Sequence, residues 1–539
     1  MRAAWQRVEP FVATKRAALG LVLVALLVYR IEAVAWPFER GRDAWDYMTY
    51  YLSFFDAHTP FTEVMLFRTP VTPFALGVPL SLGGVTALEV TMAVFYALSV
   101  LAWSLAALTY SRLAALLVAC VLLVSPGFAV SFHEASSDAI ATFAFALFAL
   151  GLVRTGFRPS TVRFAVLGAA AAGVALTRPA YVGLIAGFLV PLCLRGSWRS
   201  RIVWGGAYLA VVLATLGSWA ALNDIRYGDF TISRLSTVGR TPRVVPDAGP
   251  ATRRLTAILR RDVLSLPAYR RLHVDVQTYL HDPTSEYEWS RLLGIADRDG
   301  GISSDFRLLR EADAEAARAL SGRPTAADAT ASKGRLASIA TSMWDFASRP
   351  ANRDQTHLKP AVWPTPSPVS IAGGVKRPNP EALPPSLEAM TFGFFPCASN
   401  EIARCIVADP SRAYSNPGQA RRYTEVTRTV SRWDSRLGKG SPNQWLAIQL
   451  DRVSRYFPPP WSWLLVAGVA LGLRRVGRAG VLVALVGMAG SVLFVHAWAS
   501  GWLAAYGYPV LPAAMFAAIC AGVGRRRDAS ERKAVEGGG

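Results

Sequence analysis

Four carboxylates in two clusters are the best candidates for acid–base chemistry in this chain. They stand beside apolar stretches and are Asp43 and Asp46 in the first cluster, and Glu134 and Asp138 in the second. A carboxylate submerged in a membrane costs about 2.5 to 3.5 kcal/mol on insertion scales, so we expect carboxylates at a membrane boundary to serve a function. One such function is to take a proton from a reacting hydroxyl group.

Both clusters also have a purely structural interpretation. Trp45, Tyr47 and Tyr50 surround the first cluster and are typical of the aromatic belt at a membrane surface, which would make this segment a solvated interfacial loop. Asp138 stands where a helix is expected to begin, and an N-terminal cap stabilises a helix by about 1 kcal/mol. The sequence leaves these alternatives open.

Two arginines close to prolines are candidates for binding an anionic group. Arg68 comes before Thr69-Pro70, and Arg178 is followed by Pro179. A guanidinium group matches the geometry of a phosphate, although a long side chain near a membrane also extends toward water without binding anything. Further candidates for contacting the same anion are Tyr47, His133, His496 and Tyr506. His496 taken alone has the alternative role of a satisfied residue at the membrane interface.

The composition indicates a membrane protein. Of 539 residues, 52% are hydrophobic and only 17% are charged, whereas a soluble chain averages about 25% charged residues. Soluble enzymes and disordered chains are therefore excluded. The net charge of +20 resembles that of a nucleic-acid-binding protein, but much of the arginine lies in short clusters between apolar segments, so we predict no nucleic-acid partner.

Ten apolar segments are predicted to span the membrane, which makes the fold class an all-α polytopic membrane protein with about 10 transmembrane helices. They are Ala17 to Trp36, Val85 to Thr109, Leu113 to Ser125, Ala139 to Val153, Phe164 to Leu176, Tyr181 to Leu194, Ile202 to Leu222, Trp461 to Leu473, Ala479 to Val495 and Tyr508 to Val523. With ten spans, every intervening arginine cluster falls on the cytoplasmic side. Val71 to Leu82 contains Pro73 and Pro79, and we expect it to lie against the outer interface without crossing.

The same assignment of each loop to one side of the membrane defines the domains. Residues 1–222 form an N-terminal module of about seven spans with a first outer loop at 37–84, residues 223–460 an extracytoplasmic domain, 461–523 a C-terminal module of about three spans, and 524–539 a cytoplasmic tail. We expect an uncleaved first span, although Ala33-Val34-Ala35 also resembles a signal-peptidase site. Arg outnumbers Lys 51 to 6, which is associated with GC-rich bacterial genomes and favours a bacterial plasma membrane.

The extracytoplasmic domain is predicted to be mostly helical. Helical spacing occurs at Arg253 to Leu266, Ala268 to Leu280, Asp305 to Leu320, Ala326 to Ala347, Gln419 to Leu437 and Asn443 to Tyr456. Nine prolines between Pro350 and Pro385 predict an extended loop without a helix or ladder, with disorder as the alternative. Cys397 and Cys405 predict a disulfide in an oxidising compartment, with two free thiols as the alternative.

These features together resemble the GT-C superfamily of polytopic glycosyltransferases, in particular the protein O-mannosyltransferase and lipid A aminoarabinose transferase type. The matching features are an acid with an aromatic four residues later (Asp43 and Tyr47), an Arg-Thr-Pro before a juxtamembrane segment (Arg68 and residues 71–82), a second-loop acid (Glu134 or Asp138), and Arg178-Pro179. The late Arg-Tyr-then-Pro pattern of the family occurs here as Tyr506-Gly507-Tyr508-Pro509, without its arginine.

The resemblance implies transfer of a sugar, with inversion, from a polyprenyl-phosphate donor to a glycan, lipid or protein hydroxyl on the extracytoplasmic face. Asp43 would be the general base, while Arg68 and Arg178 would contact the phosphate. Asp46, Glu134 and Asp138 would orient the acceptor, bind sugar hydroxyls or hold a divalent cation; the sequence does not decide whether there is a metal. The alternatives are a non-catalytic GT-C-like scaffold and a lipid or glycan transporter.

Overall fold

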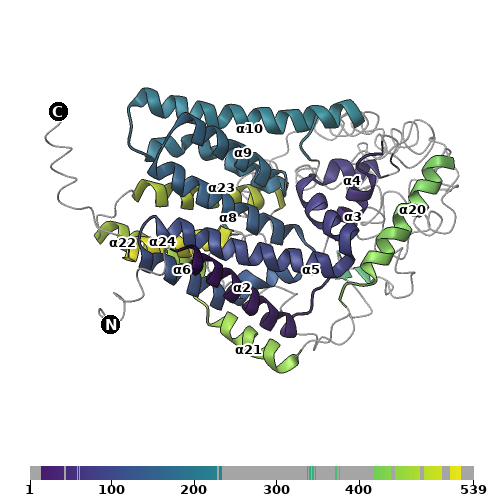
Figure 1. Cartoon of the computed structure of the whole chain (residues 1–539). Helices are drawn as coiled ribbons and strands as arrows, with labels where there is room; N and C mark the ends of the chain where they lie inside the picture. The colour runs from purple at the N-terminus through teal and green to yellow at the C-terminus, as the bar shows by residue number, and fades with distance from the viewer. Residues whose placement is uncertain are drawn as a thin grey trace.

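The computed structural model describes residues 14–41, 44–56, 59, 61–227, 230–233, 337, 339–341, 343–344, 346, 371–372, 375–376, 417–438, 443–473, 479–500 and 510–523. Asp43, Tyr506, Cys397 and Cys405 lie outside the described residues, as do the helices expected at Arg253 to Leu266, Ala268 to Leu280 and Asp305 to Leu320. The described part is predominantly helical, as predicted (Figure 1).

A helix occupies each of the ten segments predicted to span the membrane. These are α2 (Lys15–Ala35), α5 (Val71–Leu108), α6 (Arg112–Val124), α8 (Ser137–Phe157), α9 (Thr161–Ala175), the 3₁₀ helix η3 (Pro179–Cys193), α10 (Trp198–Tyr227), α22 (Pro460–Leu473), α23 (Ala479–Ser500) and α24 (Leu511–Val523). Five helices among the described residues, α2, α5, α8, α10 and α23, are long and apolar enough to cross a membrane, and the bent pair formed by α6 and the residues 127–133 raises this to six. The count of about ten is not confirmed by length and composition.

The outward faces of these helices are apolar. On α2, Leu19, Leu23, Leu27, Ile31 and Val34 follow one another at helical spacing and are each at least 50% exposed. Soluble proteins rarely expose a continuous apolar stripe of this kind, because its contact with water is unfavourable. Several helices of this chain can therefore span a membrane, with these stripes facing lipid.

The helix η3 is unusual because 3₁₀ helices rarely exceed four residues. It covers 15 residues, from Pro179 to Cys193. At a rise of about 2.0 Å per residue it is about 30 Å long, close to the thickness of the hydrocarbon core. A segment that is short in sequence thus reaches as far as a much longer α-helix.

The segment Val71 to Leu82 forms the first part of α5 and is a helix of its own, separated by a kink from the helix that follows it. The backbone angles mark the boundary: Gly83 and Gly84 depart from helical geometry, and Gly84 has φ +67, a left-handed value that favours glycine. The kink separates the proline-containing part from the span predicted to begin at Val85. The chain therefore breaks between two helices where the sequence predicted a boundary.

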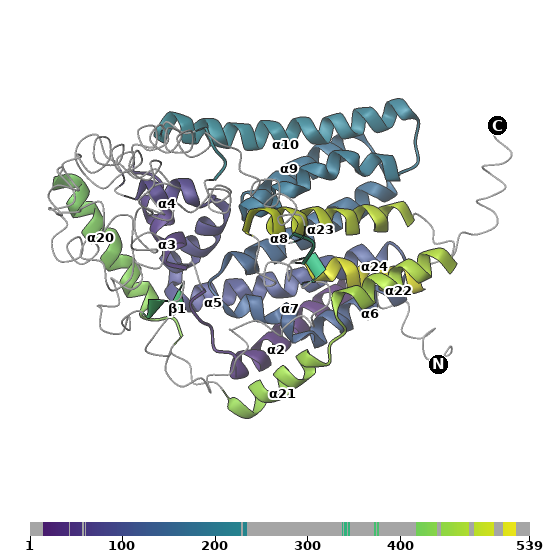
Figure 2. The same ribbon diagram turned by 180° about the vertical axis from the view of Figure 1, so that it is seen from behind.

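The helices of the bundle run side by side, and several short elements gather at one of its ends (Figures 1 and 2). These elements are α3 (Ala44–Ser53), α4 (Thr62–Phe67) and α20 (Pro417–Asp434). The remaining short elements are α7 (Pro126–Val130), the 3₁₀ turn η2 (Ser131–His133) and α21 (Gln444–Arg455), which packs against α2 and α7. The helices predicted at Gln419 to Leu437 and Asn443 to Tyr456 are confirmed by α20 and α21. Within Ala326 to Ala347, the seven described residues are helical.

One prediction for the outer domain is wrong. Strand β1 (Ile371–Ala372) pairs antiparallel with β2 (Val375–Lys376), within the proline-rich stretch in which no ladder was expected. Both strands lie between Pro368 and Pro378, where the sequence contains no proline and places Gly373-Gly374 between them. Two glycines between short strands favour a tight hairpin turn, so the local sequence carried a signal that the overall proline content obscured.

The N-terminal and C-terminal apolar helices pack into one core. Trp103 of α5 is fully buried, with its ring centroid 5.4 Å from that of Phe516 of α24 and 6.2 Å from that of Phe145 of α8. The C-terminal helices therefore pack directly on the helices that carry the acidic and arginine motifs, and they help to fix the positions of those motifs.

Candidate functional site

The first and second loops meet through their backbones. The amide of Glu39 donates to the carbonyl of His133 at 2.9 Å, and the amide of Ala135 donates to the carbonyl of Glu39 at 3.0 Å. Glu39 and Glu134 therefore form a parallel bridge, the only isolated one in the described part of the chain. The loop that leads to Asp43 is thus tied to the loop that carries Glu134.

This approach requires Gly41. A Cβ atom at position 41 would lie 2.4 Å from the carbonyl oxygen of Ala135 and 2.8 Å from Cβ of Ser136. Atoms of a side chain cannot come that close to a backbone oxygen, so any other residue would push the two loops apart. The contact therefore holds the first loop against the second at the last described residue before α3.

Glu134 is buried beside a second acidic residue. It is only 8% exposed. Burial, and to a smaller extent the neighbouring charge of Glu39, raises the pKa of its carboxyl from 4.5 to about 8. The same burial effect raises the pKa of Glu39. At neutral pH Glu134 is therefore mostly protonated, so that it can donate a hydrogen bond but is a poor anionic ligand.

Asp46 and Arg68 form a buried ion pair. Nη2 of Arg68 lies 2.6 Å and Nε 3.1 Å from Oδ2 of Asp46, and the side chains of Arg68 and Asp46 are 10% and 3% exposed, respectively. The Arg68 guanidinium carbon also lies 5.2 Å from the centroid of the Tyr47 ring. Three predicted site residues, two from α3 and one from the turn between α4 and α5, are thus brought together.

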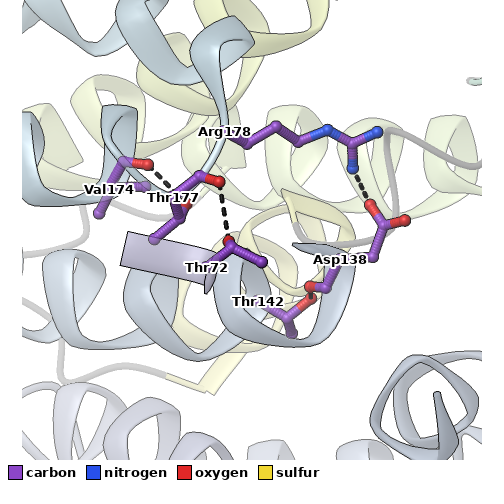
Figure 3. A network of polar contacts seen from close by, with 6 residues as sticks. All are labelled: Thr72, Asp138, Thr142, Val174, Thr177 and Arg178. Carbon is purple, nitrogen blue, oxygen red and sulfur yellow. Dashed lines mark hydrogen bonds and ion pairs between the residues drawn. The ribbon is translucent and has the colours of Figure 1, made fainter. Parts of the chain in front are cut away.

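A second ion pair joins Asp138 and Arg178 (Figure 3). Asp138 lies in the first turn of α8, and its backbone carbonyl accepts a hydrogen bond from the hydroxyl of Thr142. Nη1 of Arg178 donates to Oδ1 of Asp138. The N-cap position of α8 is occupied by Ser136, so Asp138 is not the cap. Its side chain pairs instead with an arginine 40 residues away.

The two arginine–proline segments lie side by side. The amide of Val71 donates to the carbonyl of Leu176 at 3.1 Å, and the hydroxyl of Thr72 donates to the carbonyl of Thr177 at 2.8 Å (Figure 3). The start of α5 is thereby attached to the end of α9. Arg68 and Arg178, which are 110 positions apart in the sequence, enter the same region on neighbouring backbones.

The two predicted histidines lie in different surroundings. The ring of His133 stacks on Tyr29 of α2 at 4.2 Å, and its Nε2 lies 3.9 Å from Oε2 of Glu32, so it faces the interior next to α2. The ring of His496 of α23 contacts Tyr181 edge-on, with the ring centroids 6.1 Å apart. Tyr181 stands three positions after Arg178 in the sequence. Only His496 is therefore placed near the arginine–proline segments.

Glu32 and Glu39 were missed by the sequence reasoning. Glu32 is 4% exposed, and its Oε2 has no hydrogen-bond partner among the described residues, nor has either ring nitrogen of His133. A carboxylate inside an apolar span is a signal in its own right, because it is costly there. Glu39 carried no comparable signal, since its pairing with Glu134 depends on how two distant loops fold together.

The described site consists of two Asp–Arg pairs and a carboxyl pair at one end of a helical bundle. A phosphate suits the guanidinium groups and a hydroxylated substrate suits the carboxyls. Among the described residues, which leave out Asp43, no group of three His, Cys, Asp or Glu side chains is arranged to hold a metal ion. These features define a helical protein with several apolar helices that can span a membrane and a polar site at one end of the bundle.

Comparison with known proteins adds no relative to this description. No protein-family model, no curated protein and no solved structure matches the chain significantly. Its function must therefore be inferred from the residues themselves.

Proposed function

We propose that this chain is a multi-pass plasma-membrane glycosyltransferase that moves a sugar from a polyprenyl-phosphate donor to an acceptor hydroxyl on the extracytoplasmic face. In this proposal about ten spans cross the membrane, both termini are cytoplasmic, and residues 223–460 face outward. The acceptor is a glycan, a lipid or a protein.

The observation that supports this proposal is the junction of the two arginine–proline segments. Arg68 and Arg178 arise from adjacent backbones, and a carboxylate orients each guanidinium, Asp46 in one case and Asp138 in the other. A guanidinium carries five N–H donors, so one that is held by a carboxylate can also bind a phosphate. Two such groups would stabilise the charge that grows on the departing lipid phosphate.

The carboxyl groups divide the remaining roles. Asp43 takes the proton of the acceptor hydroxyl as that oxygen attacks the anomeric carbon, and the bond between this carbon and the phosphate oxygen breaks. A phosphate leaves readily, so no general acid is needed. Glu134, whose pKa is raised to about 8, is better suited to donating a hydrogen bond to a sugar hydroxyl than to taking its proton or holding a divalent cation.

The test is transfer by the purified protein in lipid nanodiscs, with radiolabelled polyprenyl-phosphate sugars. The Asp43→Asn variant should lose transfer while its expression, insertion and thermal midpoint stay at the wild-type level. Asp224→Asn is the matched control, because Asp224 is an exposed carboxylate on α10 outside the site. Full activity of Asp43→Asn would remove Asp43 from the mechanism.

A transporter remains the second candidate because charged groups do occur within the candidate spans. Nη1 of Arg30 on α2 lies 3.3 Å from Oε1 of Glu89 on α5, and Glu32 is buried near the end of α2. Charged side chains inside the spans are the groups that a transport path through the membrane requires. Proteoliposomes loaded with a labelled lipid-linked sugar separate the two functions: a transporter moves the sugar across the bilayer intact, whereas a transferase produces a new glycoside.

A further inference from the structure

Helix α20 of the outer domain contacts both ends of the segment that carries the first acidic cluster. This segment runs from Phe38 to Phe61 and has α3 (Ala44–Ser53) at its centre. Along the chain, α20 is more than 350 positions away from this segment. Only the tertiary fold can bring elements this far apart in the sequence into contact. Because the contact lies at both ends of the segment, it can fix the position of α3.

At the start of α20, Arg422 holds the C-terminal end of α3. Its Nη2 donates to the carbonyl of Leu52 at 2.6 Å, and its Nε lies 3.3 Å from Oδ2 of Asp56. The adjacent Tyr423 is 2% exposed and stacks on Phe61, with ring centroids 5.2 Å apart. The far end of α3 is thus fixed by an ion pair, a main-chain hydrogen bond and an aromatic contact.

At the end of α20, Asp434 holds the loop before α3. Its Oδ2 lies 2.9 Å from Nη1 of Arg40, and the amide of Gly438 donates to the carbonyl of Phe38 at 3.1 Å. Gly438 has φ +71, a left-handed conformation that lets the chain reverse after the helix and direct this amide toward the loop. An acidic residue at the last position of a helix is opposed by the helix dipole, so its pairing with Arg40 offsets an unfavourable placement.

We propose that α20 is a positioning element for the first acidic cluster: Arg422 and Asp434 hold the two sides of α3, and thereby set where Asp46 of α3 stands relative to Arg68. Asp434 and its partner Arg40 are positioning residues in this proposal, since they act through the loop at residues 38–41, which leads into α3. The proposal rests on the proposed transferase function for its catalytic consequence. Its structural part is independent of that function.

The sharpest test exchanges the charges of the Arg40–Asp434 pair. The full-length protein in nanodiscs is compared with Arg40→Asp, Asp434→Arg and the double variant that carries both. The side chains of Arg40 and Asp434 are 40% and 13% exposed. Because the Arg40 end of the pair is solvated, the pair contributes little to stability and the single variants should fold. Arg428→Asp is the matched control, because it makes the same charge change on an exposed position of α20.

Two readouts separate positioning from a general loss of structure. In transfer assays each single variant should lower kcat by about tenfold, as expected for a displaced catalytic group, with the donor KM and the thermal midpoint nearly unchanged. The double variant should recover most of the lost kcat. In hydrogen exchange, the backbone amides of residues 44–53 should exchange faster in each single variant and return to the wild-type rate in the double variant.

The outcomes are distinct. If the single variants leave both exchange and kcat unchanged, or if the double variant fails to recover either one, the positioning role is overturned. If the exchange pattern appears as expected but the wild-type protein transfers no sugar from any donor tried, the positioning of α3 stands and the transferase proposal fails.

Discussion

The hydroxyl of Thr72 donates to the main-chain carbonyl of Thr177 at 2.8 Å, although the two residues are 105 positions apart. This hydrogen bond, together with the one from the amide of Val71 to the carbonyl of Leu176, attaches the start of α5 to the end of α9. Its consequence is that Arg68 and Arg178 are carried into one region. The two arginine–proline motifs of the sequence are therefore parts of a single structural junction.

The Arg178–Asp138 pair should be sensitive to loss of either partner, but in different ways. Arg178→Ala should raise the donor KM by about tenfold or more, since a charge-assisted contact to phosphate contributes about 1.5 to 3 kcal/mol. Asp138→Asn removes a carboxylate that pairs with a buried arginine and should lower stability. Arg178→Lys, which keeps the charge and loses the planar fork, should fall between wild type and Arg178→Ala in donor titrations.

The Arg68–Asp46 pair is the more deeply buried of the two, with its side chains 10% and 3% exposed. Removing one partner of a buried pair costs about 3 to 5 kcal/mol, because the other charge remains without compensation. Asp46→Asn should therefore lower the thermal midpoint in detergent markedly. The pair of Arg422 and Glu425 on α20 provides the comparison, because the Glu425 side chain is 66% exposed and lies outside the candidate spans. Glu425→Gln should change the midpoint little, and an equal loss for both variants would contradict this assignment.

Substituting Gly41 should disturb the site without altering any charge. In Gly41→Ala the new Cβ would stand 2.4 Å from the carbonyl oxygen of Ala135, and overpacking of this kind costs about 1 to 3 kcal/mol. We expect reduced transfer together with a lower thermal midpoint. Gly206→Ala is the control, because a Cβ there meets nothing within 4 Å. It should leave the midpoint unchanged or raise it slightly.

The raised pKa of Glu134 predicts how the free energy of unfolding changes with pH. Its pKa is about 8 in the folded protein against an ordinary value of 4.5, so the folded state binds more protons than the unfolded state between these values. Stability should therefore fall as pH rises from about 4.5 to about 8, by about 1.4 kcal/mol for each unit of pKa difference, and level off above that. Thermal midpoints of Glu134→Gln measured over this range should be flatter than those of wild type. Glu425→Gln, on an exposed position of α20, should retain the wild-type slope.

Much of the secondary structure could be predicted from the sequence, because each element depends on its own residues. The apolar segments mark the helices, Ser111 and Ser160 accept hydrogen bonds from the amides three residues later and cap α6 and α9, and the break in α5 falls at Gly83-Gly84. The polar motifs at the ends of these helices were also visible, since carboxylates and arginines are rare beside apolar stretches. These are local properties, and neighbouring residues determine them.

The tertiary structure decided which of these groups meet. Asp46 pairs with Arg68, Asp138 with Arg178 and Glu39 with Glu134, although each partner has other charged residues closer to it in the sequence. No periodicity predicts such pairs, because they depend on how α5 docks on α9 and on the close approach that Gly41 permits between two loops. The contact of α20 with both ends of α3 is of the same kind. A chain specifies its helices through short-range interactions, whereas long-range packing alone brings distant charges together.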